Sequence, residues 1–250
     1  MRSKYLKSLK AAVLSVTVLL LGVGVSFAAQ QVNLVARPAT ATMPDGSIVP
    51  MWGYACNGIV SGSTAVCSAA NPAAVGGWSP VVITVPAGDL TINLTNNLSF
   101  APIGSATANK VPTSLVIVGQ LGGGLGTPTY KDGPVHAPQG ATWPIAGDTS
   151  GPTFTPPTQG PRVQSFGTEV ASGATTSLTW NGLRAGTYLI ESGTHPSIQG
   201  PMGLYGILVV TTAPSGATAG TAYPGVSYAA DVPLVFSEID PMQNNAVQAA

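Results

Sequence analysis

The segment that most constrains the fold is a strand, turn and strand at residues 79–98, SPVVITVPAGDLTINLTNNL. A short apolar run, 81–85, precedes a Pro-Ala-Gly-Asp turn. After the turn, Leu90, Ile92 and Leu94 alternate with polar residues. A period of two places apolar side chains on one face of a strand and polar side chains on the other. The segment therefore predicts two strands of a sheet with one buried face.

Further short strands are predicted along the chain from apolar runs and from alternation. They fall at 31–37, 48–54, 113–118, 174–181, 186–191 and 203–211. The chain contains 31 glycines and 22 prolines and has no helix-type periodic run after residue 30. This combination predicts an all-β sandwich, with an all-β barrel or jelly roll as the alternative. A long irregular loop, 121–162, interrupts the strands and is of a length typical of functional or mobile loops.

The first 28 residues have the pattern of a secretory signal peptide. A basic start is followed by an apolar stretch at 11–25 and by Ser26-Phe27-Ala28, a small-x-small cleavage site. An uncleaved membrane anchor is the alternative, and no other segment is a candidate membrane span. We expect an exported protein of the periplasm, the cell surface or the medium. Four of the nine basic residues lie in the first ten positions, so no basic patch remains for nucleic acid.

Cys56 and Cys67 are the two cysteines of the chain, and a polar segment separates them. In an oxidising compartment a disulfide between them is the expected state. Metal binding by the two thiolates is the alternative, although no histidine or third cysteine lies nearby in sequence.

The domain boundaries follow from composition. We predict one domain over 29–213 and a Gly/Ala/Ser/Thr-rich linker over 214–230. Residues 231–250 contain VPLVFSEID, which we interpret as a C-terminal strand or as the start of a second domain.

The order of these motifs resembles the N-terminal cupredoxin domain of the multicopper oxidases. The resemblance runs from about residue 32 to 211 and is most specific at 80–98, at VPTS (111–114), and at AGTY (185–188) followed by GLYGILVV (203–210). It implies a cupredoxin-like Greek-key β-sandwich. It also implies copper as the cofactor, oxidation of a substrate with reduction of dioxygen, and further cupredoxin domains of the same or another chain as partners.

In that family this domain supplies four histidines to a three-copper cluster, in HWHG and HSH motifs. Here VIVG replaces the first motif, so Val116 and Val118 stand at two ligand positions. Counting back from Gln199 aligns Gly193 and His195 with the second motif, whereas counting forward from GTY aligns Glu191 and Gly193. The resemblance therefore implies a degenerate copper site in which His195 is the one candidate surviving ligand.

A rebuilt metal site is a further possibility. His136 in the long loop could combine with His195, and with Glu191 or Asp132, into a mixed nitrogen and oxygen site for copper or another divalent metal. Each histidine also has an ordinary interpretation, His136 as an exposed loop residue and His195 as a hydrogen-bonded residue of a connecting loop.

Three functions are consistent with these residues. The first is a multicopper-oxidase-like domain that is inactive alone and supports copper-dependent oxidation only together with further domains. The second is a non-catalytic binding or structural module of the periplasm or cell surface. The third is a small copper carrier that uses His195, His136 and Met202.

Overall fold

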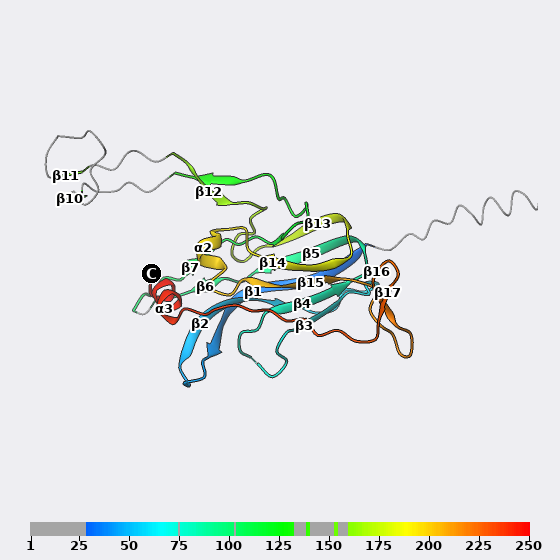
Figure 1. The fold of residues 1–250 in the computed structure, drawn as a ribbon. Helices are drawn as coiled ribbons and strands as arrows, with labels where there is room; N and C mark the ends of the chain where they lie inside the picture. Colours follow the sequence, from blue (N-terminus) through cyan, green and yellow to red (C-terminus); the bar gives the residue numbers. More distant parts are fainter. Residues whose placement is uncertain (1–28, 75, 103, 133–138, 141–152, 155–159) are drawn as a thin grey trace, which may run out of the picture.

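The structure is a computed structural model that describes residues 29–74, 76–102, 104–132, 139–140, 153–154 and 160–250. The predicted signal peptide, 1–28, and His136 lie outside these residues. Two sheets pack face to face (Figure 1). The first sheet has the order β13-β5-β1-β2 and the second β3-β4-β15-β14-β8. The strands of the first sheet are β1 (Gln30–Thr42), β2 (Ile48–Cys56), β5 (Gly88–Asn96) and β13 (Thr175–Leu183).

The second sheet consists of β3 (Val66–Ala69), β4 (Val81–Val85), β8 (Val116–Ile117), β14 (Gly186–Glu191) and β15 (Tyr205–Val210). Each sheet contains one parallel pair, β1 with β5 and β15 with β4, among antiparallel neighbours. The chain crosses between the sheets after β2, after β4, between β5 and β8, between β8 and β13, and after β13. These crossings give Greek-key connectivity, so the predicted fold class, an all-β cupredoxin-like Greek-key β-sandwich, is confirmed.

The core forms between the sheets from the alternating residues of the strands. Leu90, Ile92 and Leu94 of β5 are fully buried, as their period of two predicted. They share one apolar cluster with Ile83 of β4 and Ile190 of β14. The polar residues between them lie on the outer face, where the Thr91 and Thr179 hydroxyls hydrogen-bond across strands at 3.1 Å.

The predicted disulfide is present and links the two sheets. Cys56 ends β2 in the first sheet, Cys67 lies on β3 in the second, and their Cα atoms are 5.8 Å apart. Among the described residues, no helix has both the length and the apolar character that crossing a membrane requires.

The short elements outside the two sheets are β6 (Ser99–Phe100), β7 (Asn109–Lys110), β9 (Thr129–Lys131), β10 (Gln139–Gly140), β11 (Thr153–Phe154), β12 (Arg162–Ser165), α2 (Pro196–Gln199), β16 (Gly220–Tyr223), β17 (Val226–Tyr228) and α3 (Pro241–Ala249). The segment expected to be a linker, 214–230, instead contains the β16–β17 hairpin. The Thr211 hydroxyl holds it to the domain by donating to the Thr221 carbonyl at 2.9 Å.

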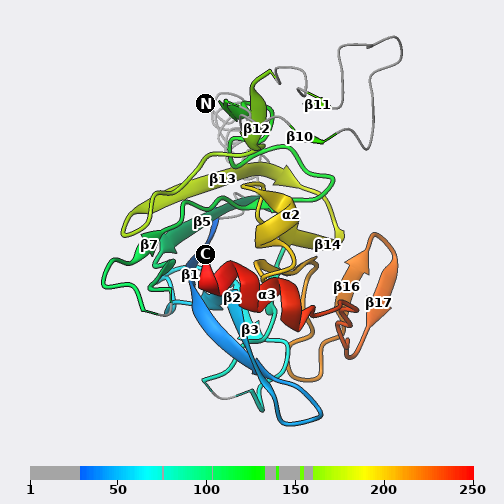
Figure 2. The same ribbon diagram turned by 90° about the vertical axis from the view of Figure 1, so that its left-hand side faces the viewer.

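The expected C-terminal strand does not form. Within the second sheet both neighbours of β4 and of β15 are already present, so residues 229–240 find no edge there and run across the outer face of these strands (Figure 1). Val235 packs there on Val82, Ile207 and Val209. The chain then ends in α3, which Asp240 caps by accepting from the Met242 N–H at 2.9 Å and which packs on β2 (Figure 2).

Candidate functional site

The positions that the sequence comparison above placed at the copper-ligand motifs, His195 excepted, come together in one cavity of about 280 Å³ on the outer face of the second sheet. Val116 on β8 and Glu191 at the end of β14 are direct register partners. Val118 and Gly193, which follow these two strands, line the same cavity. Both residues given by counting forward, Glu191 and Gly193, therefore border one space, whereas counting back places only Gly193 there.

The walls of the cavity are apolar. Besides Val116 and Val118 they include Ile117, Leu125 and Phe166. Val116 is 8% exposed and Val118, beyond the end of the short strand, is 46% exposed. Aliphatic side chains have no lone pair for a metal, and copper sites in proteins use imidazole, thiolate or thioether ligands. The residues that line this cavity therefore do not fit a copper cluster.

Two loop segments bring Leu125 and Phe166 to the cavity. The Phe166 N–H donates to the Gly193 carbonyl at 2.9 Å and so holds the segment after β12 beside the site. Leu125 follows Gly122 and Gly123, which have positive φ and lie against the Trp180 ring. A Cβ at either glycine would collide with that ring, so only glycine allows this close approach.

Glu191 is the one titratable side chain among the described residues that line the cavity. Burial raises the pKa of its carboxyl above the ordinary value, and no hydrogen bond to a described residue opposes this shift. Its charge contributes in turn to the raised pKa of the buried Tyr54 phenol, although burial is the main cause of that shift.

A network of buried hydroxyl and amide groups lies behind the cavity. Gln199 of α2 accepts from the Ser192 hydroxyl at 2.6 Å and from the Thr113 hydroxyl at 2.8 Å, and its amide donates to the Pro112 carbonyl at 2.7 Å. The Thr194 hydroxyl donates to Ser114 Oγ at 2.9 Å and to Ser165 Oγ at 3.0 Å. These neutral groups satisfy one another and leave no charge to attract a metal.

Sequence reasoning missed this network. Its members come from the residues before β8, the end of β12, the loop after β14 and the helix α2. The hydroxyl residues at 113–114 and 192–194 were visible in the sequence, but their pairing depends on contacts between distant segments.

His195, the candidate surviving ligand, does not line the cavity. It precedes α2 in a left-handed conformation with φ 40° and ψ 59°. Its N–H donates to the Gln164 carbonyl at 2.9 Å, and its carbonyl accepts from the Ile198 and Gln199 N–H groups at 2.8 and 2.9 Å. Its backbone thus orders the loop and starts the helix, and its side chain makes no capping hydrogen bond.

The other proposed metal ligands are not brought together in the described part of the chain. His136 lies outside it, Asp132 is exposed beside β9, and Met202 is fully buried in the core. No group of three His, Cys, Asp or Glu side chains able to hold a metal occurs among the described residues. Cys56 and Cys67 are bonded to each other in the disulfide, so neither is a free thiolate that could bind a metal.

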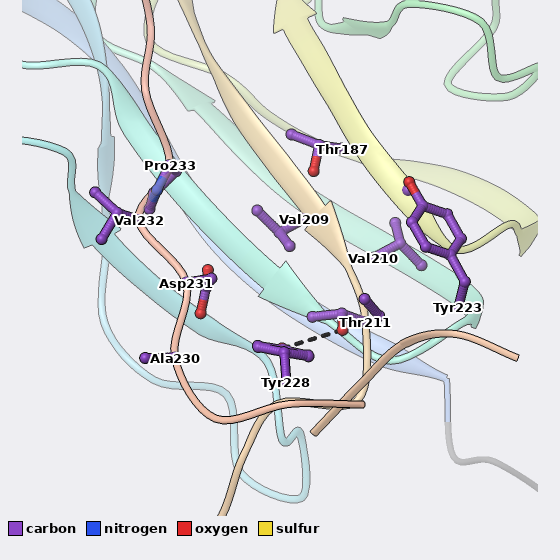
Figure 3. A pocket seen from close by; sticks show the side chains of 12 residues that line it. Thr187, Val209, Val210, Thr211, Tyr223, Tyr228, Ala230, Asp231, Val232 and Pro233 are labelled. Carbon is purple, nitrogen blue, oxygen red and sulfur yellow. Dashed lines mark hydrogen bonds between the residues drawn. The ribbon is translucent and has the colours of Figure 1, made fainter. Parts of the chain in front are cut away.

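A second cavity, also of about 280 Å³, lies between the β16–β17 hairpin, residues 230–233 and the outer face of β14 and β15 (Figure 3). Val209 and Val210 contribute to its apolar side, and the Thr211 hydroxyl donates to the Tyr228 hydroxyl at 3.1 Å. Asp231 borders it but is exposed to solvent. No sequence signal had indicated this cavity.

No family model matches the sequence, and no curated protein does. Solved structures similar to this chain include a multi-copper oxidase from Pseudomonas thermotolerans, with 17% identity over 74% of this chain and 30% of that one at a TM-score of 0.41. The multicopper oxidase mgLAC is 16% identical over 73% and 39% of the two chains, with a TM-score of 0.40. Fet3p, a multicopper oxidase that functions in iron import, is 16% identical over 73% and 23%, with a TM-score of 0.38.

This chain thus spans between about a quarter and two fifths of the length of these three solved structures. Each TM-score lies below 0.5, so the fold class rests on the strand order and registers described above.

Proposed function

We propose that this chain is an exported, multicopper-oxidase-like cupredoxin domain that has exchanged its copper site for an apolar binding cavity. It corresponds to the N-terminal domain of that family, and it is a non-catalytic module when alone. The observation that carries the proposal is the lining of the cavity, where Val116, Val118 and Gly193 converge without a nitrogen or sulfur donor.

The buried network behind the cavity supports the same function. Hydroxyl and amide groups that already hydrogen-bond to one another gain little from binding a cation. Glu191 offers one carboxylate, and a single oxygen ligand leaves most of the coordination shell of a transition metal unfilled. The chain therefore acts by binding a ligand or by packing against further cupredoxin domains, and any copper-dependent oxidation belongs to those partners.

The direct test is metal analysis of the full chain purified from an exporting host. After loading with Cu(I) and with Cu(II) and dialysis, we expect copper far below one equivalent in the wild type and in His195→Ala alike. Stoichiometric copper that His195→Ala removes would establish the copper-carrier function instead and would refute this proposal.

A second test concerns the fold. Circular dichroism spectra in the near-ultraviolet and thermal unfolding curves should be the same with and without chelator, because apolar packing and a disulfide, not a metal, stabilise the core. A metal that contributed to folding would lower the unfolding temperature when it is removed.

A further inference from the structure

The cavity at Glu191 has the size and the chemistry of a site for a small ligand. Its volume of about 280 Å³ lies near the lower end of the range for ligand pockets in proteins. Ile117 and Phe166 make its surroundings apolar, and an apolar pocket with few polar groups is the usual form of a small-molecule site.

The carboxylate of Glu191 determines which charge a ligand of this cavity must carry. It lies opposite Val116 at the point where β14 ends, and burial alone raises its pKa. No hydrogen bond or ion pair with a described residue compensates it. A partly buried carboxylate without a partner is destabilising, and a ligand of opposite charge removes that cost.

The described chain does not supply the opposite charge. Neither lysine nor arginine lines the cavity, and His195 lies outside it. The register partner of Glu191 on β15 is Tyr205, whose phenol carries no positive charge in either protonation state. The complement to Glu191 must therefore come from the ligand.

We infer that this cavity binds a small organic cation, in which a protonated amine pairs with Glu191 and an apolar body packs against Val116, Leu125 and Phe166. The inference rests on the proposed function, because a metal in this space would exclude the ligand. The carboxylate of Glu191 requires a positive charge on the ligand, and the apolar walls require that the rest of the ligand be apolar. A charged pair at an apolar wall is stronger than a neutral hydrogen bond, so the cavity should prefer an amine to an alcohol of the same shape.

The test compares benzylamine, which is protonated at neutral pH, with benzyl alcohol as its neutral counterpart. Binding to the full chain, kept in chelator, is measured by calorimetry and by chemical shifts. We expect Glu191→Gln to weaken benzylamine binding roughly ten- to hundred-fold, the range for a hydrogen bond to a charged group, and to leave benzyl alcohol binding nearly unchanged. Glu238→Gln is the matched control, because Glu238 is exposed and does not line the cavity.

A second variant tests the place of binding without touching the charge. Val118 is half exposed at the cavity, so Val118→Trp should fill the space and abolish binding of both compounds while the fold is kept. Equal binding of amine and alcohol, equal affinity in Glu191→Gln, or failure of both compounds to bind would overturn the inference. Failure of both in a chain that holds no copper leaves the proposed function standing, whereas stoichiometric copper in the untreated chain refutes the proposed function itself.

Discussion

A single methyl group added at position 193 tests whether the chain is tightly packed beside the cavity at Gly193. A Cβ there would lie 2.9 Å from Val116 Cγ1, 3.2 Å from Ser114 Oγ and 3.4 Å from the Gly167 nitrogen. Carbon atoms in contact prefer about 3.5–4.0 Å, so Val116 must move by at least about 0.6 Å. Overpacking of this kind costs about 1–3 kcal/mol. Gly193 is not among the glycines with positive φ, so the strain in Gly193→Ala is steric.

Replacing glycine by alanine also restricts the unfolded chain, which stabilises the protein by about 0.4–1 kcal/mol. With an overpacking cost of about 2 kcal/mol, the middle of the range, Gly193→Ala should be destabilised by roughly 1 kcal/mol. For a chain of this size that corresponds to a fall of roughly 2–4 °C in the unfolding temperature. In a Val116→Ala background the 2.9 Å contact is gone, and the same substitution should cost close to nothing. The measurement is a double-mutant cycle from urea unfolding, with an expected coupling of about 1 kcal/mol.

Gly160→Ala is the matched control, because a Cβ at Gly160 meets no atom within 4 Å. It should change the free energy of unfolding by less than about 0.5 kcal/mol. If Gly193→Ala were neutral, or equally destabilising in the wild-type and Val116→Ala backgrounds, the packing argument for this site would be refuted.

Three further predictions concern the disulfide, the network around Gln199 and the charge of Glu191. Replacing Cys56 and Cys67 together by alanine should lower the free energy of unfolding by about 3 kcal/mol, measured in urea, because the disulfide closes a loop of 11 residues in sequence separation. Gln199→Leu leaves the Thr113 hydroxyl and its neighbours without their buried acceptor, and calorimetric unfolding should show a loss of about 2–4 kcal/mol. Glu191→Gln should change the pH dependence of stability, because burial raises the pKa of Glu191 in the folded protein. The free energy of unfolding of the wild type, relative to the variant, should be greatest below pH 4.5 and should fall as the pH rises from 4.5 through the raised pKa.

Each of these predictions has its own contrary outcome. A reducing agent should destabilise the wild type and leave the cysteine-free variant unchanged, so an equal response of both would contradict the first. An isosteric Gln199→Glu variant that unfolds like the wild type would argue against the amide as the link between α2 and Pro112. A constant difference in unfolding temperature between Glu191→Gln and the wild type from about pH 3 to pH 8 would contradict the third.

The alternation in β5 fixed its buried face from local information, because successive side chains of a strand point to opposite sides whatever the sheet order. The same holds for the chemistry of Val116 and Val118, whose side chains carry no lone pair for a metal in any fold. The cysteine pairing was also predicted from the sequence, because the chain has two cysteines and a disulfide between them was the state expected for an exported protein.

The positions of the other groups of the site could not be derived from the local sequence. That Glu191 lies opposite Val116 follows from the register of β14 against β8, which the sequence left open. Three segments distant in sequence, at 112–114, at 165 and at 192–199, build the hydroxyl network around Gln199. Residues 231–250 had the pattern of a strand, but the neighbouring strands of the second sheet were already paired, and Asp240 provided a cap for a helix. Sequence determined which side chains could not bind copper, and only tertiary packing, which joins segments far apart in the chain, decided what occupies that space instead.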